Sequence, residues 1–291
     1  MAERIGVIGL GVMGSAMAAN LLRSGHPVLG FDLEPERLNA LTGIGGTAAG
    51  SAGEVAAEAD VIVFSLPTTG ALAAVAAEIA ANARDGMVCL EAGTFPLEAK
   101  LAAHQVLAGA GVDLLDTPLS GTGLQAADAT LVVFASGSRE GFDKAQPVFA
   151  AIGRSTHYLG EFGNGSRMKY IANLLVAVHG LAAAEAHTLG IAAGLDPALV
   201  QTVMEDGVGS SKIFEIRGPM MVADEYPPAA RLDILLKDAT IISDFARSVG
   251  SPTPLLDAAL PVYAESSAAG LGGLDAAALC RYLENQGGIE R

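Results

Sequence analysis

Residues 5–32, IGVIGLGVMGSAMAANLLRSGHPVLGFD, carry the pattern that decides the fold. An apolar run leads into a glycine-rich turn, which is followed by a helix-forming segment, a Gly-His-Pro break and a second apolar run that ends in an acid. This order predicts strand, turn, helix and strand, the fingerprint of a dinucleotide-binding βαβ unit. The turn consists of Gly9, Leu10, Gly11, Val12, Met13 and Gly14.

Each glycine of this turn has its own physical role. Gly9 allows the chain to turn tightly, Gly11 lets the backbone approach a pyrophosphate without a Cβ in the way, and Gly14 lets the helix pack closely on the strand. The unpaired N–H groups at the helix start then face the phosphates. A glycine-rich turn without a ligand is the alternative, and the surrounding strand, helix, strand and acid argue against it.

Asp32 closes the second apolar run, 23 residues after Gly9. A carboxylate near this spacing accepts hydrogen bonds from the adenosine ribose hydroxyls. Because the same carboxylate repels the 2′-phosphate of NADP, we predict NAD as the preferred cofactor.

The composition limits the partners that the chain can have. With 291 residues it is long enough for two domains with separate cores. The chain has a formal net charge of −15, from 17 basic and 32 acidic residues. It therefore lacks the basic surface that binding to nucleic acid or to an anionic membrane needs. We therefore expect neither partner, and we expect lysines near any site that binds an anionic substrate.

Hydropathy and cysteine usage predict a cytoplasmic protein. Apolar residues make up 51% of the sequence, and their excess is largely alanine. No apolar run of about 18 residues lacks a charge or a structure-breaking residue, which argues against a membrane span. The chain enters its first expected strand at once and leaves no room for a signal peptide. Cys89 and Cys280 lie on separate apolar stretches, so a disulfide framework is not expected.

Strands and helices alternate along the first half of the chain. Apolar strands are expected at 61–66, 87–90, 112–116 and 130–135, with helices at 51–58, 70–83, 97–108 and after Ser138. Ligands bind at the carboxyl ends of such strands, so Leu66, Pro67 and Thr94 are predicted cofactor contacts. Residues 1–162 are thus predicted to form an α/β, Rossmann-type doubly wound NAD-binding domain.

From Gly163 the pattern becomes helical. Ser166 is an N-cap candidate for a long, proline-free helix that runs to Gly194 and joins the two domains. No clear strand follows, and the helical periods break at 207–211, 227–228, 250–254 and 270–273. Residues 163–291 are predicted to form an all-α substrate and oligomerisation domain, whose alanine-rich helices favour a homodimer or homotetramer.

Lys169 is the candidate proton acceptor. Hydride transfer from an alcohol to a nicotinamide needs a group that takes the hydroxyl proton. Asn173, four residues on, shares the same helix face, and small or apolar residues further along that face would desolvate the lysine. An ordinary exposed lysine is the alternative, although the dipole at a helix N-terminus disfavours a cation.

Other candidates surround this pair. Ser120, Gly121 and Thr122 follow a strand, and their N–H groups and hydroxyls suit a substrate carboxylate; an ordinary turn is an equally open reading. Lys237 interrupts an apolar helix, so it either snorkels to solvent or reaches the cofactor and keeps Lys169 deprotonated by like-charge repulsion. The five histidines show no metal-ligand spacing, and no metal is expected.

Four motifs in order resemble the β-hydroxyacid dehydrogenase family, over essentially the whole chain. They are GLGVMGSAMAANLL with Asp32, DTPLSGTGLQAADATL, GNGSRMKYIAN and LLKDATIISDFA. The resemblance implies that Lys169 is the catalytic lysine and that Asn173 orients the substrate. It also implies that residues 120–122 bind the carboxylate and that Thr94 and Lys237 contact the cofactor.

Two positions depart from the family pattern. Thr122 and Ala129 stand where the family usually has glycine. The Thr122 side chain either narrows the acid pocket or adds a hydroxyl to it, so the family's best-known substrate cannot simply be transferred. The stretch LLVAVHGLAAAEA resembles the L-threonate dehydrogenase branch and hints at a polyhydroxylated acid.

The predicted reaction is NAD-dependent oxidation of a small, 3-hydroxyisobutyrate-like 3-hydroxy acid to a semialdehyde or keto acid. A glyoxylate or succinic semialdehyde reductase would share every motif. An imine reductase commonly lacks the catalytic lysine, and a non-catalytic NAD-binding module would not need Lys169, Asn173 and Lys237 together.

Overall fold

The opening stretch forms β1 (Ile5–Ile8), α1 (Val12–Arg23) and β2 (Val28–Phe31), as predicted. Gly9 has a φ of 88°, in the left-handed region that favours glycine. A Cβ on Gly14 would lie 1.8 Å from the carbonyl oxygen of Gly9, so a larger residue would push α1 off the turn. This computed structural model describes residues 3–290.

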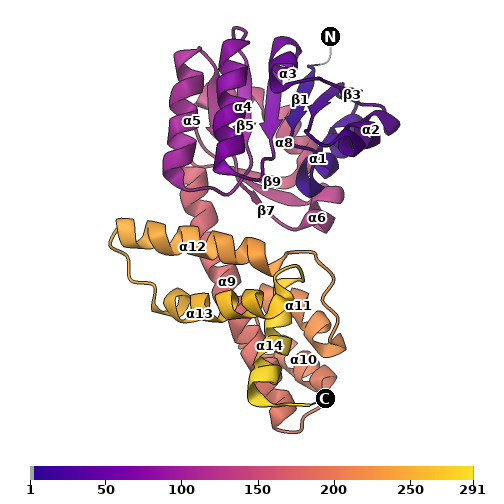
Figure 1. The fold of residues 1–291 in the computed structure, drawn as a ribbon, viewed down its shortest axis with the longest axis vertical. Helices are drawn as coiled ribbons and strands as arrows, with labels where there is room; N and C mark the ends of the chain where they lie inside the picture. The colour runs from indigo at the N-terminus through magenta and orange to yellow at the C-terminus, as the bar shows by residue number, and fades with distance from the viewer. Residues whose placement is uncertain (1–2, 291) are drawn as a thin grey trace. The chain divides into compact units, whose positions relative to one another are not determined.

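Six parallel strands form the main sheet, in the order β3-β2-β1-β4-β5-β6 (Figure 1). Besides β1 and β2, this sheet contains β3 (Thr47–Ala48), β4 (Val61–Phe64), β5 (Val88–Glu91) and β6 (Asp113–Asp116). The strand order reverses between β1 and β4, and ligands of doubly wound sheets bind beyond the carboxyl ends of the strands at this point. The predicted Rossmann-type fold is confirmed, with the glycine turn at its switch point.

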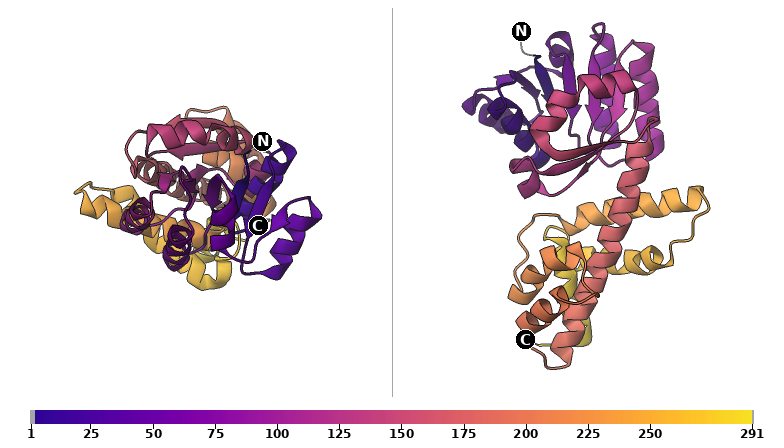
Figure 2. Two further views of the ribbon diagram at one scale, coloured as in Figure 1. Left: turned by 90° about the horizontal axis from the view of Figure 1, so that it is seen from above. Right: turned by 180° about the vertical axis from the view of Figure 1, so that it is seen from behind.

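Helices cover both faces of the main sheet. On one face, α3 (Ala52–Glu58), α4 (Thr69–Ala81) and α5 (Leu97–Gly109) enclose one apolar core. On the other, α1, α7 (Arg139–Lys144) and α8 (Gln146–Ile152) enclose a second, and Figure 2 shows this side from behind. Burial on both faces explains why the central strands read as continuous apolar runs. Helix α2 (Pro35–Gly43) follows β2.

A second, three-stranded sheet contains the predicted strand at 130–135, but its other two strands were not predicted. β7 (Leu119–Ser120) pairs antiparallel with β8 (Leu131–Ala135), and β9 (Gly153–Tyr158) pairs parallel with β8. The segment between the predicted strands at 112–116 and 130–135 therefore contains a strand of its own, and α6 (Gly123–Ala127) joins it to β8. β7 is too short, and β9 (GRSTHY) too polar, to show a recognisable strand pattern.

Helix α9 (Asn164–Ala192) contains the point, between Lys169 and Tyr170, at which the chain divides into two compact units. Ser166 lies inside α9 and is not its N-cap, because the helix begins two residues earlier. By length and composition α9 could cross a membrane, with a mean hydropathy of 1.4 in its most apolar window. That finding weakens the sequence argument against a span, although Ala177 and Ala184 of α9 are buried in the core of the second unit.

The described part of the second unit, residues 170–290, is helical, as predicted (Figure 1). Its core joins α9 to the later helices through Tyr170, Phe214, Leu235 and Tyr263, among others. The later elements are α10 (Pro197–Glu205), α11 (Lys212–Ala223), α12 (Leu232–Ser248), α13 (Pro254–Ser266), a π-helical turn (Ser267–Leu271), a 3₁₀ turn (Ala276–Ala278) and α14 (Leu279–Gly287).

Candidate active site

The glycine turn has the geometry of a phosphate site. Gly11 is the N-cap residue of α1 and has no side chain that could satisfy the first N–H groups of this helix. A Cβ on Gly11 would meet nothing closer than the Arg37 guanidinium, at 4.0 Å, so a ligand can approach the backbone here. The turn therefore fits the pyrophosphate of NAD at a helix N-terminus.

Asp32 is fixed against this turn. Its carboxylate accepts hydrogen bonds from the Leu10 N–H at 2.6 Å and the Glu34 N–H at 3.0 Å, and Arg37 Nη1 lies 3.1 Å from Oδ2. Burial opposes ionisation, but these three partners outweigh it and hold the pKa of Asp32 below its usual value. Asp32 is thus a fixed negative charge beside the glycine turn, as a preference for NAD requires.

The other predicted cofactor contacts of the first unit follow β4 and β5. A Cβ on Gly9 would lie 3.5 Å from Leu66 Cδ2, so Leu66 lies against the glycine turn, and Pro67 next to it is exposed. Thr94 is partly buried in the loop after β5, where the Gly93 N–H donates to Glu91 Oε1 at 2.8 Å. All three lie at the edge of the sheet at which the glycine turn lies.

Residues 120–122 also lie close to the glycine turn. A Cβ on Gly123 would be 2.7 Å from Val12 Cγ1, which places α6 against the start of α1. Gly121 has a φ of 141°, so this bend favours glycine. The Thr122 N–H donates to Gln125 Oε1 at 2.7 Å, so Thr122 has its hydroxyl, and not this N–H, to offer to a carboxylate.

Lys169 is 9% exposed and lies in the first two turns of α9. Three residues earlier, the Ser166 N–H and hydroxyl donate to the two oxygens of Asp116, at 2.6 and 2.9 Å. Asp116 is at the end of β6, so the start of α9 is anchored to the main sheet. The burial of Lys169 disagrees with the alternative of an ordinary exposed lysine.

In the second unit, Asp238 joins two predicted site residues. Asn173 Nδ2 donates to Asp238 Oδ2 at 2.8 Å, and Lys237 Nζ lies 2.9 Å from Asp238 Oδ1. Asp238 therefore orients the Asn173 amide and offsets the charge of Lys237.

Ala129, one of the two departures from the family pattern, has a φ of 54°. This is the left-handed conformation in which a Cβ is unfavourable. The chain therefore keeps a strained alanine where glycine would be relaxed, at the end of the segment that carries α6.

Sequence reasoning missed several charged groups at these places. Arg37 pairs with Asp32, and Asp238 pairs with Lys237 and Asn173. A third set, Lys100, Glu91 and Asp116, is fully buried. A signal for this set was present, because each acid ends an apolar strand and Lys100 lies in the helix between them.

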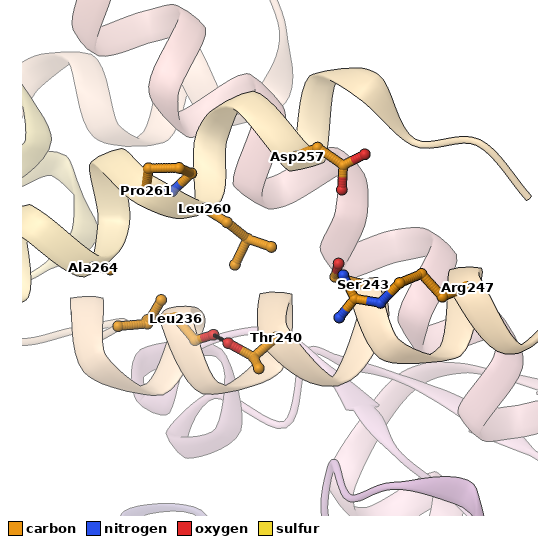
Figure 3. A pocket seen from close by; sticks show the side chains of 8 residues that line it. All are labelled: Leu236, Thr240, Ser243, Arg247, Asp257, Leu260, Pro261 and Ala264. Atoms are coloured by element: carbon orange, nitrogen blue, oxygen red, sulfur yellow. Dashed lines mark hydrogen bonds between the residues drawn. The ribbon is translucent and has the colours of Figure 1, made fainter.

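A cavity of about 540 Å³ opens between α12 and α13 (Figure 3). It contains none of the predicted site residues, and its Arg247 is paired with Asp244. The cavity is therefore separate from the predicted site. Its lining residues are Leu236, Thr240, Ser243, Arg247, Asp257, Leu260, Pro261 and Ala264.

Two family models match the chain in succession. The NAD binding domain of 6-phosphogluconate dehydrogenase matches residues 4–160. The model for the NAD-binding of NADP-dependent 3-hydroxyisobutyrate dehydrogenase matches residues 163–283. Together they span nearly all of the sequence.

Individual proteins are similar over the same length. An L-threonate dehydrogenase from Cupriavidus necator is 36% identical over 97% of this chain and 96% of its own. A 2-(hydroxymethyl)glutarate dehydrogenase from Eubacterium barkeri is 30% identical over 98% of this chain and 96% of its own. The solved structure of Mycobacterium tuberculosis 3-hydroxyisobutyrate dehydrogenase with L-serine has a TM-score of 0.90 and 29% identity, and covers 97% of this chain and 99% of that one.

Proposed function

The chain belongs to the β-hydroxyacid dehydrogenase family of NAD-dependent oxidoreductases, and from this premise we propose that it oxidises a small, 3-hydroxyisobutyrate-like 3-hydroxy acid to the semialdehyde or keto acid. The similar proteins are named for L-threonate and 2-(hydroxymethyl)glutarate, and the solved structure contains L-serine. All three molecules combine a carboxylate with a nearby hydroxyl. This shared chemistry supports the proposal more than any single substrate does.

Each residue of the proposed site has one task. Bound NAD supplies the hydride acceptor. Lys169, as the neutral amine, accepts the hydroxyl proton while the C=O bond forms, and returns it in the reverse reaction. Asn173 orients the hydroxyl. The hydroxyls of Ser120 and Thr122 hold the carboxylate, and Gly121 allows their loop to bend.

The position of Lys169 carries the proposal. Lys169 is only 9% exposed to solvent. Asn173 lies on the next turn of α9, and a hydrogen bond to Asp238 orients its amide. An amine in a poorly solvated setting, one helical turn from an oriented amide, is suited to take a proton from a substrate hydroxyl.

A substrate screen tests this proposal directly. We expect NADH formation with at least one of 3-hydroxyisobutyrate, L-serine, D-glycerate and L-threonate. The methyl esters of the same acids are the matched controls and should react poorly, because residues 120–122 are proposed to bind a carboxylate. Faster reduction of glyoxylate or succinic semialdehyde would favour a reductase, and NAD binding without turnover of any acid would contradict the proposal.

We also propose a homodimer that associates through α9. In the second unit, Ile171, Leu175 and Leu189 are 58%, 48% and 72% exposed, with Ala182 between the last two. Their spacings of four and seven residues place them on one face of the helix, in the heptad pattern of paired helices. Burying this face against a second copy would remove its apolar surface from water.

A charged residue in this face should prevent association. Leu175→Arg is expected to convert a dimer into a monomer in size-exclusion chromatography with light scattering, because the guanidinium would lie unpaired in the interface. Leu33→Arg, at an apolar residue that is 86% exposed in the first unit, is the control and should leave the mass unchanged. A monomeric parent protein, or a Leu175→Arg protein of unaltered mass, would argue against the proposed interface.

A further inference from the structure

Three fully buried ionisable side chains form a cluster, in which Glu91 and Asp116 end β5 and β6 and Lys100 lies on α5 between them. Lys100 Nζ is 2.5 Å from Glu91 Oε2 and 2.8 Å from Asp116 Oδ1, and it donates to the Gly93 carbonyl oxygen at 2.7 Å. Burial opposes the charge of the lysine, but Asp116 and Glu91 outweigh it and raise the pKa of Lys100 above its usual value. Lys100 is therefore a protonated ammonium that donates to Asp116 and to the Gly93 carbonyl oxygen and forms an ion pair with Glu91.

One side of this cluster reaches the start of α9. Asp116 accepts the N–H and the hydroxyl of Ser166, and Ser136 Oγ accepts the Gly165 N–H at 2.9 Å. A Cβ on Gly165 would lie 2.4 Å from the carbonyl oxygen of Phe134, so this end of the helix lies directly on the sheet backbone. Two N–H groups that a helix start normally leaves unpaired are thus bound to defined side chains. Lys169 follows within one turn.

The other side of the cluster reaches the loop after β5. Gly93 accepts from Lys100 through its carbonyl oxygen and donates to Glu91 Oε1 through its N–H. The peptide groups on both sides of Gly93 are therefore held. Thr94, the predicted cofactor contact, is the next residue. The same lysine thus links the Thr94 loop with the helix start that leads to Lys169.

Stability alone is a poor explanation for this cluster. Taking charges out of water is costly, and a buried ion pair can often be replaced by apolar residues of similar volume without loss of stability. Hydrogen-bonded charges differ from apolar side chains in that they define directions as well as distances. A requirement for fixed geometry at this edge of the sheet accounts for their presence.

We propose that Lys100, Glu91 and Asp116 are positioning residues, which hold the Thr94 loop and the Lys169 end of α9 in one geometry for hydride and proton transfer. This inference rests on the proposed function, because it takes Lys169 as the proton acceptor. None of the three residues is proposed to touch the substrate.

Variants at the α9 side of the cluster test the proposal by kinetics. Ser166→Ala removes one hydrogen bond to Asp116, and Asp116→Asn removes the charge while keeping the shape. In both, kcat is expected to fall about 10- to 100-fold while the KM for NAD stays within about twofold, as for a small misplacement of a reacting group. Leu107→Ala, a cavity variant on the same helix as Lys100, is the control for lost stability and should keep its kcat while folded.

The variant Lys169→Ala separates this proposal from the proposed function. If Lys169→Ala is inactive while Ser166→Ala and Asp116→Asn keep the parent kcat, the positioning role is wrong and the reaction stands. If Lys169→Ala keeps its turnover, the proposed function is wrong.

A spectroscopic readout does not depend on turnover. The chain has five lysines, so reductive methylation with a ¹³C label gives few NMR signals, and the signal of Lys169 is identified by its loss in Lys169→Ala. We expect this signal to shift in Ser166→Ala and to stay unchanged in Leu107→Ala. An unchanged Lys169 signal in Ser166→Ala would overturn the positioning role, whatever the activity.

Discussion

Lys169→Ala is expected to lower kcat by about 10²- to 10⁴-fold, the range that a positioned general acid or base contributes. Alanine cannot take the hydroxyl proton, so the alcohol would have to lose it to water while the hydride departs. The NAD-binding turn and Asp32 are unchanged, and the dissociation constant for NAD should stay within about twofold. Steady-state kinetics on the best acid of the screen and an NAD titration measure both quantities.

Lys212→Ala is the matched control for this experiment. Lys212 begins α11 with a side chain that is 78% exposed and paired with Glu215, so its loss should leave kcat unchanged. Near-normal turnover by the Lys169→Ala variant would show that Lys169 is not the proton acceptor. Equal loss of kcat and NAD affinity would point to a damaged fold in place of a missing proton acceptor.

Asp32→Asn is expected to shift the ratio of kcat/KM for NAD to that for NADP by about 10²- to 10³-fold toward NADP. The amide keeps the shape of the carboxylate and can still accept from the Leu10 N–H. The charged hydrogen bonds to the ribose hydroxyls are lost, which costs about 1.5–3 kcal/mol, or about 10- to 100-fold for NAD. The repulsion of the 2′-phosphate disappears, and Arg37, 3.1 Å from the carboxylate, becomes available to bind that phosphate.

The double variant Asp32→Asn with Arg37→Met separates these two causes. Without the guanidinium, the decrease in kcat/KM for NAD should remain, and most of the increase in kcat/KM for NADP should disappear. Comparable kcat/KM values for the two cofactors in the parent protein would show that Asp32 does not set the preference. An Asp32→Asn variant that still favours NAD would lead to the same conclusion.

The parts of the fold that are encoded locally could be predicted from the sequence. The glycine turn lies within six residues, and Gly9 and Gly14 meet each other there as the spacing suggests. The strands of the main sheet are buried on both faces, so each one stands out as an apolar run. The long proline-free stretch after Gly163 likewise shows α9 directly.

Contacts between distant residues could not be predicted in this way. Ser166 meets Asp116 across 50 residues, and Asn173 meets Asp238 across 65. Such pairs depend on which strand ends and helix faces the tertiary fold brings together, and no local periodicity reports this. Strand β7 was not predicted for a related reason, because these two residues form a strand only through their pairing with β8.

The Lys100 cluster also constrains how this sequence can change over evolutionary time. Substitution of the lysine alone would leave two carboxylates buried without their cationic partner. Substitution of one acid alone would remove one of the two anionic partners of the buried ammonium. Either change costs about 3–5 kcal/mol, a large part of the 5–15 kcal/mol that keeps a typical domain folded. Substitutions at positions 91, 100 and 116 are therefore expected to be epistatic: a lineage that abandons the cluster has to replace its members together, or first gain stability elsewhere.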